Sequence, residues 1–244
     1  MEAASTIRDA VAQVSVLRQA CAADGALRDA VSAIKALQAR RFASTYADLL
    51  AGGDHAAAAR FFLDELYSDR DYAERDAQFS RIAGAVQRLF PQQVAATAAA
   101  LAQLHLLTEQ LDHAMGTAWR EARGDDAARY TQAWRTVGRR ASRQQQLEVV
   151  LGIGREMIKL TRTPGLRLML KMMRGPAAAA GLSALQNFLE AGFDTFGDMA
   201  RTRGRAEHFL QTVTQRESAF VGLMFDAPAV ACETELRRIL GIAR

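Results

Sequence analysis

Long runs of strong helix-forming residues, interrupted at intervals by glycine and proline, dominate this chain of 244 residues. Ala, Leu, Gln, Arg and Glu fill these runs, and all five have a high helix propensity. No segment combines period-two alternation with enrichment in β-branched residues, which is the pattern typical of a strand. The sequence therefore predicts an all-α fold.

The positions of glycine and proline predict where the helices end, because glycine favours left-handed stops and proline disfavours helical geometry in the residue before it. We expect nine or ten helices joined by short turns in a compact bundle. No low-complexity linker divides the chain, so residues 1–244 are expected to form one domain, in which two lobes could meet near 162–176. The expected breaks lie at Asp24-Gly25, Gly52-Gly53, Asp71, Pro91, Gly124, Pro164, 174–176, Gly204 and Pro228.

Charge and cysteine usage narrow the class of protein. A net charge of +4, from 31 basic and 27 acidic residues, is too small to indicate nucleic-acid or lipid binding by itself. Cys21 and Cys232 have no metal-ligand spacing and are expected to be reduced thiols. The N-terminus has no long apolar region, and no run approaches ~18 uncharged apolar residues, so we expect a cytoplasmic protein.

Residues 61–76 mix aromatic and charged side chains more densely than any other part of the chain. Asp71 and Glu74 have the spacing of a capping box, and Asp76 adds negative charge to the same first turns of a helix. A helix start therefore explains these carboxylates.

Asp64 and Glu65 need a different explanation, because they lie inside the preceding helix among apolar residues. Either they occupy a solvated helix edge, or one of them points inward. A buried carboxylate needs a partner, for which Arg60, Arg75 or an ion is a candidate.

The segment "LAQLHLLTEQLDHAM" contains the strongest candidate site. On a helix, His105, Glu109 and Asp112 fall within an arc of about 60°, next to an apolar face. The favoured interpretation is that His105 pairs with a carboxylate or backbone group at the edge of the core. The alternative is a polar pocket between helices, lined by Asp64, Glu65, Arg75, His105, Glu109 and Asp112.

A metal centre is a further alternative for the same helix. Ferritin-like bundles hold iron or manganese with glutamates and Glu-x-x-His pairs, and here His105, Glu109 and Glu65 would be the ligands. The pair of Glu-x-x-His motifs is missing. We therefore expect no cofactor, with iron or manganese as the alternative.

Basic residues are interspersed among apolar residues between 155 and 174. Such a segment could lie on an anionic membrane surface or bind an acidic helix of a partner protein. Burial in the bundle with basic side chains reaching outward explains it more simply. The candidates for surface binding are Lys159, Arg162, Arg167, Lys171 and Arg174.

Arginines also concentrate in "WRTVGRRASRQQQ", where Trp134 could stack on a base. No helix-turn-helix pattern accompanies them, so a solvated face is the favoured interpretation and nucleic acid is not an expected partner. The chain has no Walker loop, G-x-S-x-G or His-Glu-x-x-His motif. We expect "GIG" at 152–154 and the small residues of "AAAAG" to mark close helix packing.

Three phrases, "RFFLDELYSDRDYAERDAQF", "LHLLTEQLD" and "MRGPAAAAGLSALQNFLEAGFDTF", resemble a group of uncharacterised bacterial hypothetical proteins. The resemblance spans about 60–200 and implies a shared helical scaffold, with no catalytic residue to transfer.

The sequence thus favours a non-catalytic helical adaptor that recognises a protein partner and could form a homodimer. A ligand- or metal-binding bundle is the second hypothesis, and a peripheral binder of anionic membranes is the third. The first two differ in a structural expectation. A ligand binder should bring Glu65 and the His105 stripe to one cavity, whereas an adaptor should pair them internally and expose an apolar patch.

Overall fold

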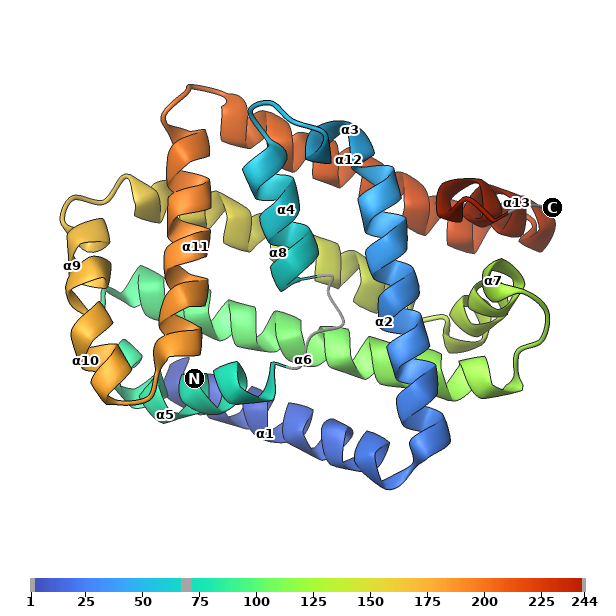
Figure 1. Ribbon diagram of the computed structural model, residues 1–244, viewed down its shortest axis with the longest axis horizontal. Helices are drawn as coiled ribbons and strands as arrows, with labels where there is room; N and C mark the ends of the chain where they lie inside the picture. The colour runs from blue at the N-terminus through green and yellow to red at the C-terminus, as the bar shows by residue number, and fades with distance from the viewer. Residues whose placement is uncertain (1–2, 67–71, 243–244) are drawn as a thin grey trace.

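The computed structural model describes residues 3–66 and 72–242, which form helices joined by short connections and contain no strand (Figure 1). The all-α prediction is confirmed for these residues. In chain order the helices are α1 (Ala3–Ala23), α2 (Gly25–Thr45), α3 (Ala47–Leu50), α4 (Ala56–Glu65), α5 (Ala73–Leu89), α6 (Gln92–Glu121), α7 (Asp126–Val137), α8 (Arg140–Thr161), α9 (Leu166–Met172), α10 (Arg174–Ala179), α11 (Ser183–Ala200), α12 (Arg205–Asp226) and α13 (Ala229–Leu240).

The prediction of nine or ten helices is wrong, because three expected helices are each divided. Tyr46 separates α2 from α3 with a non-helical conformation. Gly138 and Arg139 take φ values of 61° and 55°, and these consecutive left-handed residues separate α7 from α8. Gly181, with φ of 65°, divides α10 from α11. One or two residues outside the helical conformation are thus enough to stop a helix where tertiary packing turns the chain.

Two glycine-containing motifs behave differently from each other. Gly154 packs closely, since a Cβ placed on it would lie 2.6 Å from Cδ2 of Leu210 on α12. Close packing is therefore confirmed at that position of "GIG". It is wrong for Gly181 of "AAAAG", where a Cβ would meet nothing within 4 Å. There the amide of Leu182 donates to the carbonyl of Ala177 at 2.8 Å and closes a helix-terminating turn.

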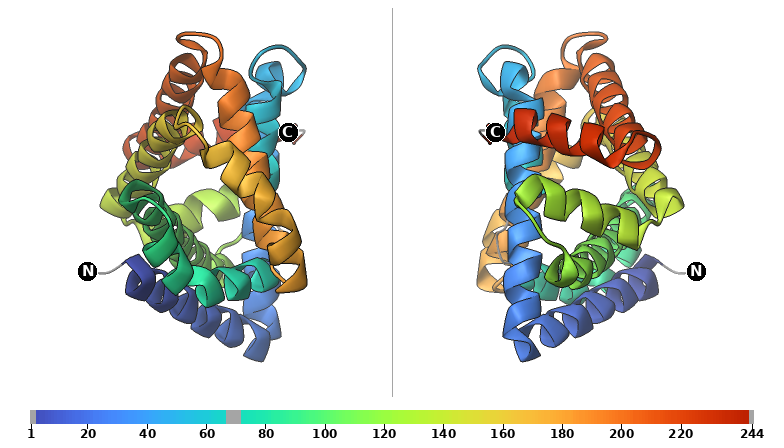
Figure 2. Two further views of the ribbon diagram at one scale, coloured as in Figure 1. Left: turned by 90° about the vertical axis from the view of Figure 1, so that its left-hand side faces the viewer. Right: turned by 90° about the vertical axis from the view of Figure 1, so that its right-hand side faces the viewer.

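Helices α6 and α8 run along the long axis of the molecule, and α2, α4 and α11 cross them on one face (Figure 1). Helix α6 packs against α1, α2, α7 and α8, and α8 packs in turn against α11 and α12. Seen from either end, the helices surround the interior from three sides: α1 and α5, then α6, α8 and α12, then the crossing helices (Figure 2). The arrangement places α6 and α8 side by side along one wall of the interior.

The apolar core is divided into several clusters instead of one continuous mass. One cluster joins α2, α6, α7, α12 and α13 around Trp119 and Trp134. A second lies between α2, α4, α8, α11 and α12. A third joins α1, α5, α6 and α11, and a small fourth links α8, α9 and α11. Space between separate clusters is where an internal cavity can form.

Local signals in the sequence account for several helix ends. Asp24 caps α2 and Asp125 caps α7, each accepting a hydrogen bond from a backbone amide three residues on. The capping box expected at Asp71 lies outside the described residues. Cys21 and Cys232 are both free thiols, as expected. Within the described ranges, no helix has the length and apolarity that crossing a membrane requires.

Candidate functional site

A cavity of about 460 Å³ lies between α6, α8 and the helices that cross them. This volume is within the range of small-molecule sites, which is roughly 300–1,000 Å³. Its wall is mainly apolar, with aromatic side chains such as Phe61, Phe188 and Phe193. A smaller group of charged and amide side chains lines the remainder.

The polarity of the wall changes along the length of α8. Arg143 and Gln146 line the cavity near the start of the helix, and Met157 and Leu160 line it near the end. The helical rise from Arg143 to Leu160 is about 25 Å. The cavity is therefore long and amphipathic in its lining.

Helix α6 has the same gradient in the opposite chain direction. Val94 and Leu101 line the apolar part of the cavity, and Glu109 and Asp112 line the polar part. The hydrogen bond from Gln146 of α8 to the hydroxyl of Thr108 on α6, at 2.8 Å, fixes the two helices in this register. Both walls thus become polar at the same end.

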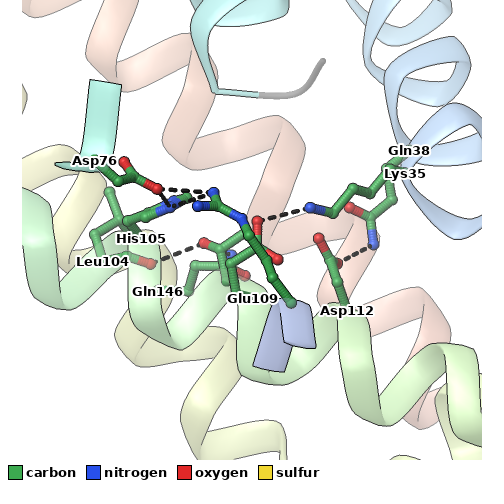
Figure 3. Close-up of polar contacts among 10 residues, drawn as sticks. Lys35, Gln38, Asp76, Leu104, His105, Glu109, Asp112 and Gln146 are labelled. Atoms are coloured by element: carbon green, nitrogen blue, oxygen red, sulfur yellow. Dashed lines mark hydrogen bonds and ion pairs between the residues drawn. The ribbon is translucent and has the colours of Figure 1, made fainter. Parts of the chain in front are cut away.

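The predicted ionisable stripe of α6 faces helices α1, α2 and α5 (Figure 3). His105 Nε2 lies 2.8 Å from Oδ2 of Asp76, which also accepts a hydrogen bond from Arg18 at 2.7 Å. One turn further, Glu109 accepts from the ammonium of Lys35 at 2.6 Å. Two different helices therefore supply partners for successive members of the stripe.

Asp112, the last member of the stripe, is held differently. Its Oδ1 accepts a hydrogen bond from the amide of Gln38 at 3.1 Å, and no described cation lies within ion-pair distance (Figure 3). Asp112 is only 2% exposed. Burial raises the pKa of its carboxyl, and the positive charges of Lys35 and Arg143 offset this only in part. The uncharged form is thus favoured more than in an ordinary aspartate.

The pKa shifts of Asp76 and Lys35 favour the charged form of each side chain, in contrast to Asp112. Burial alone would raise the pKa of Asp76, but hydrogen bonds and charge from His105 and Arg18 lower it overall. Burial alone would lower the pKa of Lys35, but Glu109 and Asp112 raise it overall. The charged forms of Asp76 and Lys35 are therefore favoured.

Glu65 and Arg75 complete the polar part of the wall on the α4–α5 side. Glu65 pairs with Arg75 at 3.0 Å, and both line the cavity. Arg75 also stacks on Phe188, 4.4 Å from the ring centroid. Asp64 is the predicted pocket residue that does not reach the wall, and its backbone carbonyl accepts from the hydroxyl of Tyr72. The structure therefore brings five of the six predicted pocket residues to one cavity.

A family model for a domain of unknown function, DUF8198, matches residues 17–229. The chain belongs to this family. The match includes every cavity-lining side chain named above, so the cavity lies within the family domain. No curated protein and no solved structure shows significant similarity to the chain.

The carboxylates and imidazoles in the described part of this DUF8198 domain do not gather into a metal-binding set. Glu65, His105 and Glu109 each face a different partner, namely Arg75, Asp76 and Lys35. Across residues 3–66 and 72–242, no three His, Cys, Asp or Glu side chains are grouped as metal ligands would be.

Two features of the DUF8198 cavity were not predicted from the sequence. Arg41 on α2 pairs with Glu217 on α12 at 2.6 Å, and both are buried. Arg143 is 7% exposed and lies over the ring of Trp134, 4.2 Å from its centroid, so a solvated face is wrong for these two residues. A usable signal exists for Arg143, since it continues the stripe of Leu147, Val150 and Gly154 on α8.

The basic segment 155–174 is partly buried and partly exposed. Ile158, Leu160 and Leu166 are buried, as the favoured interpretation expected. That interpretation is wrong for Leu168 and Met172, which are 64% and 70% exposed. Among the predicted surface-binding residues, Lys159, Arg167 and Arg174 pair with Glu156, Asp194 and Glu190, whereas Arg162 and Lys171 are exposed on the same segment.

Proposed function

We propose that this protein binds a small, largely apolar molecule in the cavity between α6 and α8. The observation that carries the proposal is the cavity itself, whose wall is mainly apolar and has a few fixed polar groups at one end. Sites of this composition and size are typical of small-molecule binders. The ion pairs of Lys35 with Glu109 and Arg75 with Glu65 would hold the polar wall rigid before a ligand enters.

The distribution of exposed apolar side chains gives less support to the adaptor hypothesis. Among the described residues, large hydrophobic side chains are exposed at Val16 on α1, at Leu168, Met172 and Met173 near α9, and at Val230 on α13. They do not form one broad face, whereas protein-binding sites are contiguous apolar patches of several hundred Å². Glu65 and the His105 stripe line one cavity, as expected for a ligand binder, and they also pair internally, as expected for an adaptor.

The test is a binding titration with N-phenyl-1-naphthylamine, a neutral apolar probe whose fluorescence rises when it leaves water. We expect saturable binding with one site per chain. In a Val150→Trp variant the indole would fill the middle of the cavity, because Val150 lines it between Arg143 and Leu160. Binding should then be lost while the helical content and the cooperative unfolding remain.

The matched control is Gln145→Trp, which adds the same ring at an exposed position of the same helix. This variant should bind the probe like the wild type. Equal binding by the wild type, Val150→Trp and Gln145→Trp would place the probe elsewhere and contradict the proposal.

A second candidate function has a specific observation in its favour. Leu168 and Met172 are exposed on α9 beside the exposed Lys171, which is the arrangement of a helix that inserts apolar side chains into an anionic bilayer. Under this hypothesis the protein should sediment with vesicles containing phosphatidylserine, and salt should weaken the association. A Leu168→Asp/Lys171→Glu variant that sediments as strongly as the wild type would contradict it.

A further inference from the structure

Arg143 is a buried cation for which the described part of the chain supplies no ion pair. The residue is 7% exposed and lines the polar end of the cavity. Its Nη2 is buried without any hydrogen-bond partner, and the same holds for Nε1 of Trp134, the ring on which Arg143 stacks. An isolated buried charge and unpaired donors are costly, so this pair of side chains is incomplete as it stands.

The charges around Arg143 cancel one another in pairs. Among the charged side chains that line the cavity, Lys35 pairs with Glu109, Arg41 with Glu217, and Arg75 with Glu65, while Asp76 pairs with Arg18 and His105. Arg143 and Asp112 remain. Asp112 accepts its hydrogen bond from Gln38 and forms no ion pair with Arg143. Among the described residues that line the cavity, Arg143 is therefore the cation that no carboxylate pairs with.

We propose that the cavity binds an amphiphile with one negative charge, such as an alkyl carboxylate, whose head group pairs with Arg143. This inference rests on the proposed function and names the class of ligand for the same site. A carboxylate would accept hydrogen bonds from the planar guanidinium, the geometry for which arginine is best suited. One ligand charge would pair with Arg143, the cavity-lining cation for which residues 3–66 and 72–242 supply no ion pair.

The remainder of the wall fits the alkyl chain of such a ligand. From Arg143 the cavity follows α8 towards Met157 and Leu160, and Leu166 and Phe193 of the fourth core cluster form its far end. Burying an alkyl chain along this path contributes about 0.8 kcal/mol per CH₂, which is about a fourfold gain in affinity for each carbon. Head-group recognition and chain burial are thus separated along one cavity.

The experiment compares decanoate, 1-decanol and acetate by isothermal titration calorimetry. We expect decanoate to bind about ten- to a hundredfold more tightly than 1-decanol, since a buried charged hydrogen bond is worth that much. Acetate, which has the head group without the chain, should give no measurable binding. In Arg143→Met the preference for decanoate over 1-decanol should disappear, whereas Arg143→Lys should retain part of it.

Arg140→Gln is the matched control, because Arg140 is an exposed arginine on the same helix as Arg143. The Arg140 side chain stacks on Phe225 and pairs with Asp226. This variant should keep the full preference. If 1-decanol binds as tightly as decanoate to the wild type, the anionic head group is contradicted and the apolar cavity stands. If neither compound binds, the proposed function itself fails. If Arg143→Met unfolds, the preference of the wild type and of Arg143→Lys for decanoate over 1-decanol still tests whether Arg143 binds the anionic head group.

Discussion

Arg41 and Glu217 form a buried ion pair that joins helices distant in the chain, with Nη1 of Arg41 2.6 Å from Oε1 of Glu217. The hydroxyl of Tyr46 donates to the same oxygen at 3.0 Å, and the Arg41 guanidinium lies over the ring of Phe220. Both charged residues line the cavity. The pair thus fixes α2 against α12 at the polar end of the proposed site.

Glu217→Gln should destabilise the protein by about 3 kcal/mol, because it leaves Arg41 buried beside a neutral partner. The measurement is urea denaturation followed by circular dichroism. The control is Asp48→Asn, which removes the partner of Arg216 in a more exposed ion pair between α3, which follows α2 directly, and α12. That variant should lose less than about 1 kcal/mol. Equal losses in the two variants would contradict the importance given to the buried pair.

Acid should weaken the contact of Asp76 with His105 and Arg18. Since the pKa of Asp76 is lowered in the folded state below its ordinary 3.8, the folded protein binds fewer protons there than the unfolded chain. Its contribution to stability is therefore complete above about pH 4 and is lost as the pH falls through the lowered pKa. Asp76→Asn should cost about 2 kcal/mol at pH 7 and less at pH 3. A cost that does not change between these pH values would contradict this reasoning.

Asp112 should have the opposite pH dependence. Its pKa is raised above the ordinary 3.8 in the folded state, so its charged form destabilises the fold as the pH rises through the raised value. Asp112→Asn retains an oxygen for Gln38 and removes the charge. We expect this variant to be more stable than the wild type at pH 8, with the difference shrinking towards zero near pH 3.5. Urea midpoints across this range provide the measurement, and a variant that is less stable at pH 8 would contradict the sign.

At Gly116, helix α6 approaches α2 closely. A Cβ there would lie 2.5 Å from Cγ2 of Val31 and 3.1 Å from its backbone nitrogen, so the helices would have to separate. Gly116→Ala should cost about 1–3 kcal/mol. Gly152→Ala is the control, because a Cβ at that helical glycine would meet only the end of the Arg155 side chain at 3.9 Å. The control should be neutral or slightly stabilising. The measurement is the midpoint of thermal unfolding, and a midpoint for Gly116→Ala as high as that for Gly152→Ala would contradict the close approach.

The sequence predicted the features that depend on local periodicity. The spacing of His105, Glu109 and Asp112 places them on one face of α6 beside the core, and the structure shows them there. Their partners could not be predicted individually, because Lys35 and Asp76 come from other helices and nothing local indicates the pairing. Non-local contacts of this kind are decided by how the helices cross.

Arg143 and Leu168 show how composition misled the interpretation in both directions. Arg143 lies in an arginine-rich segment that is typical of a solvated face, yet one helix face buries it against Trp134. Leu168 lies in an apolar segment that is typical of a core, yet it is 64% exposed on the short helix α9. In each case the direction in which the helix packs, and not the residue type, decides which side chain is buried.

The most direct test of the central claim is a crystal structure of the full chain grown with 10-bromodecanoate, measured for anomalous scattering from bromine. The proposal predicts a bromine peak inside the cavity beside Val150 and Ile153 of α8, with the carboxylate within hydrogen-bond distance of Arg143. An empty cavity, or a bromine peak only on the outer surface, would contradict the claim that this protein binds its ligand between α6 and α8.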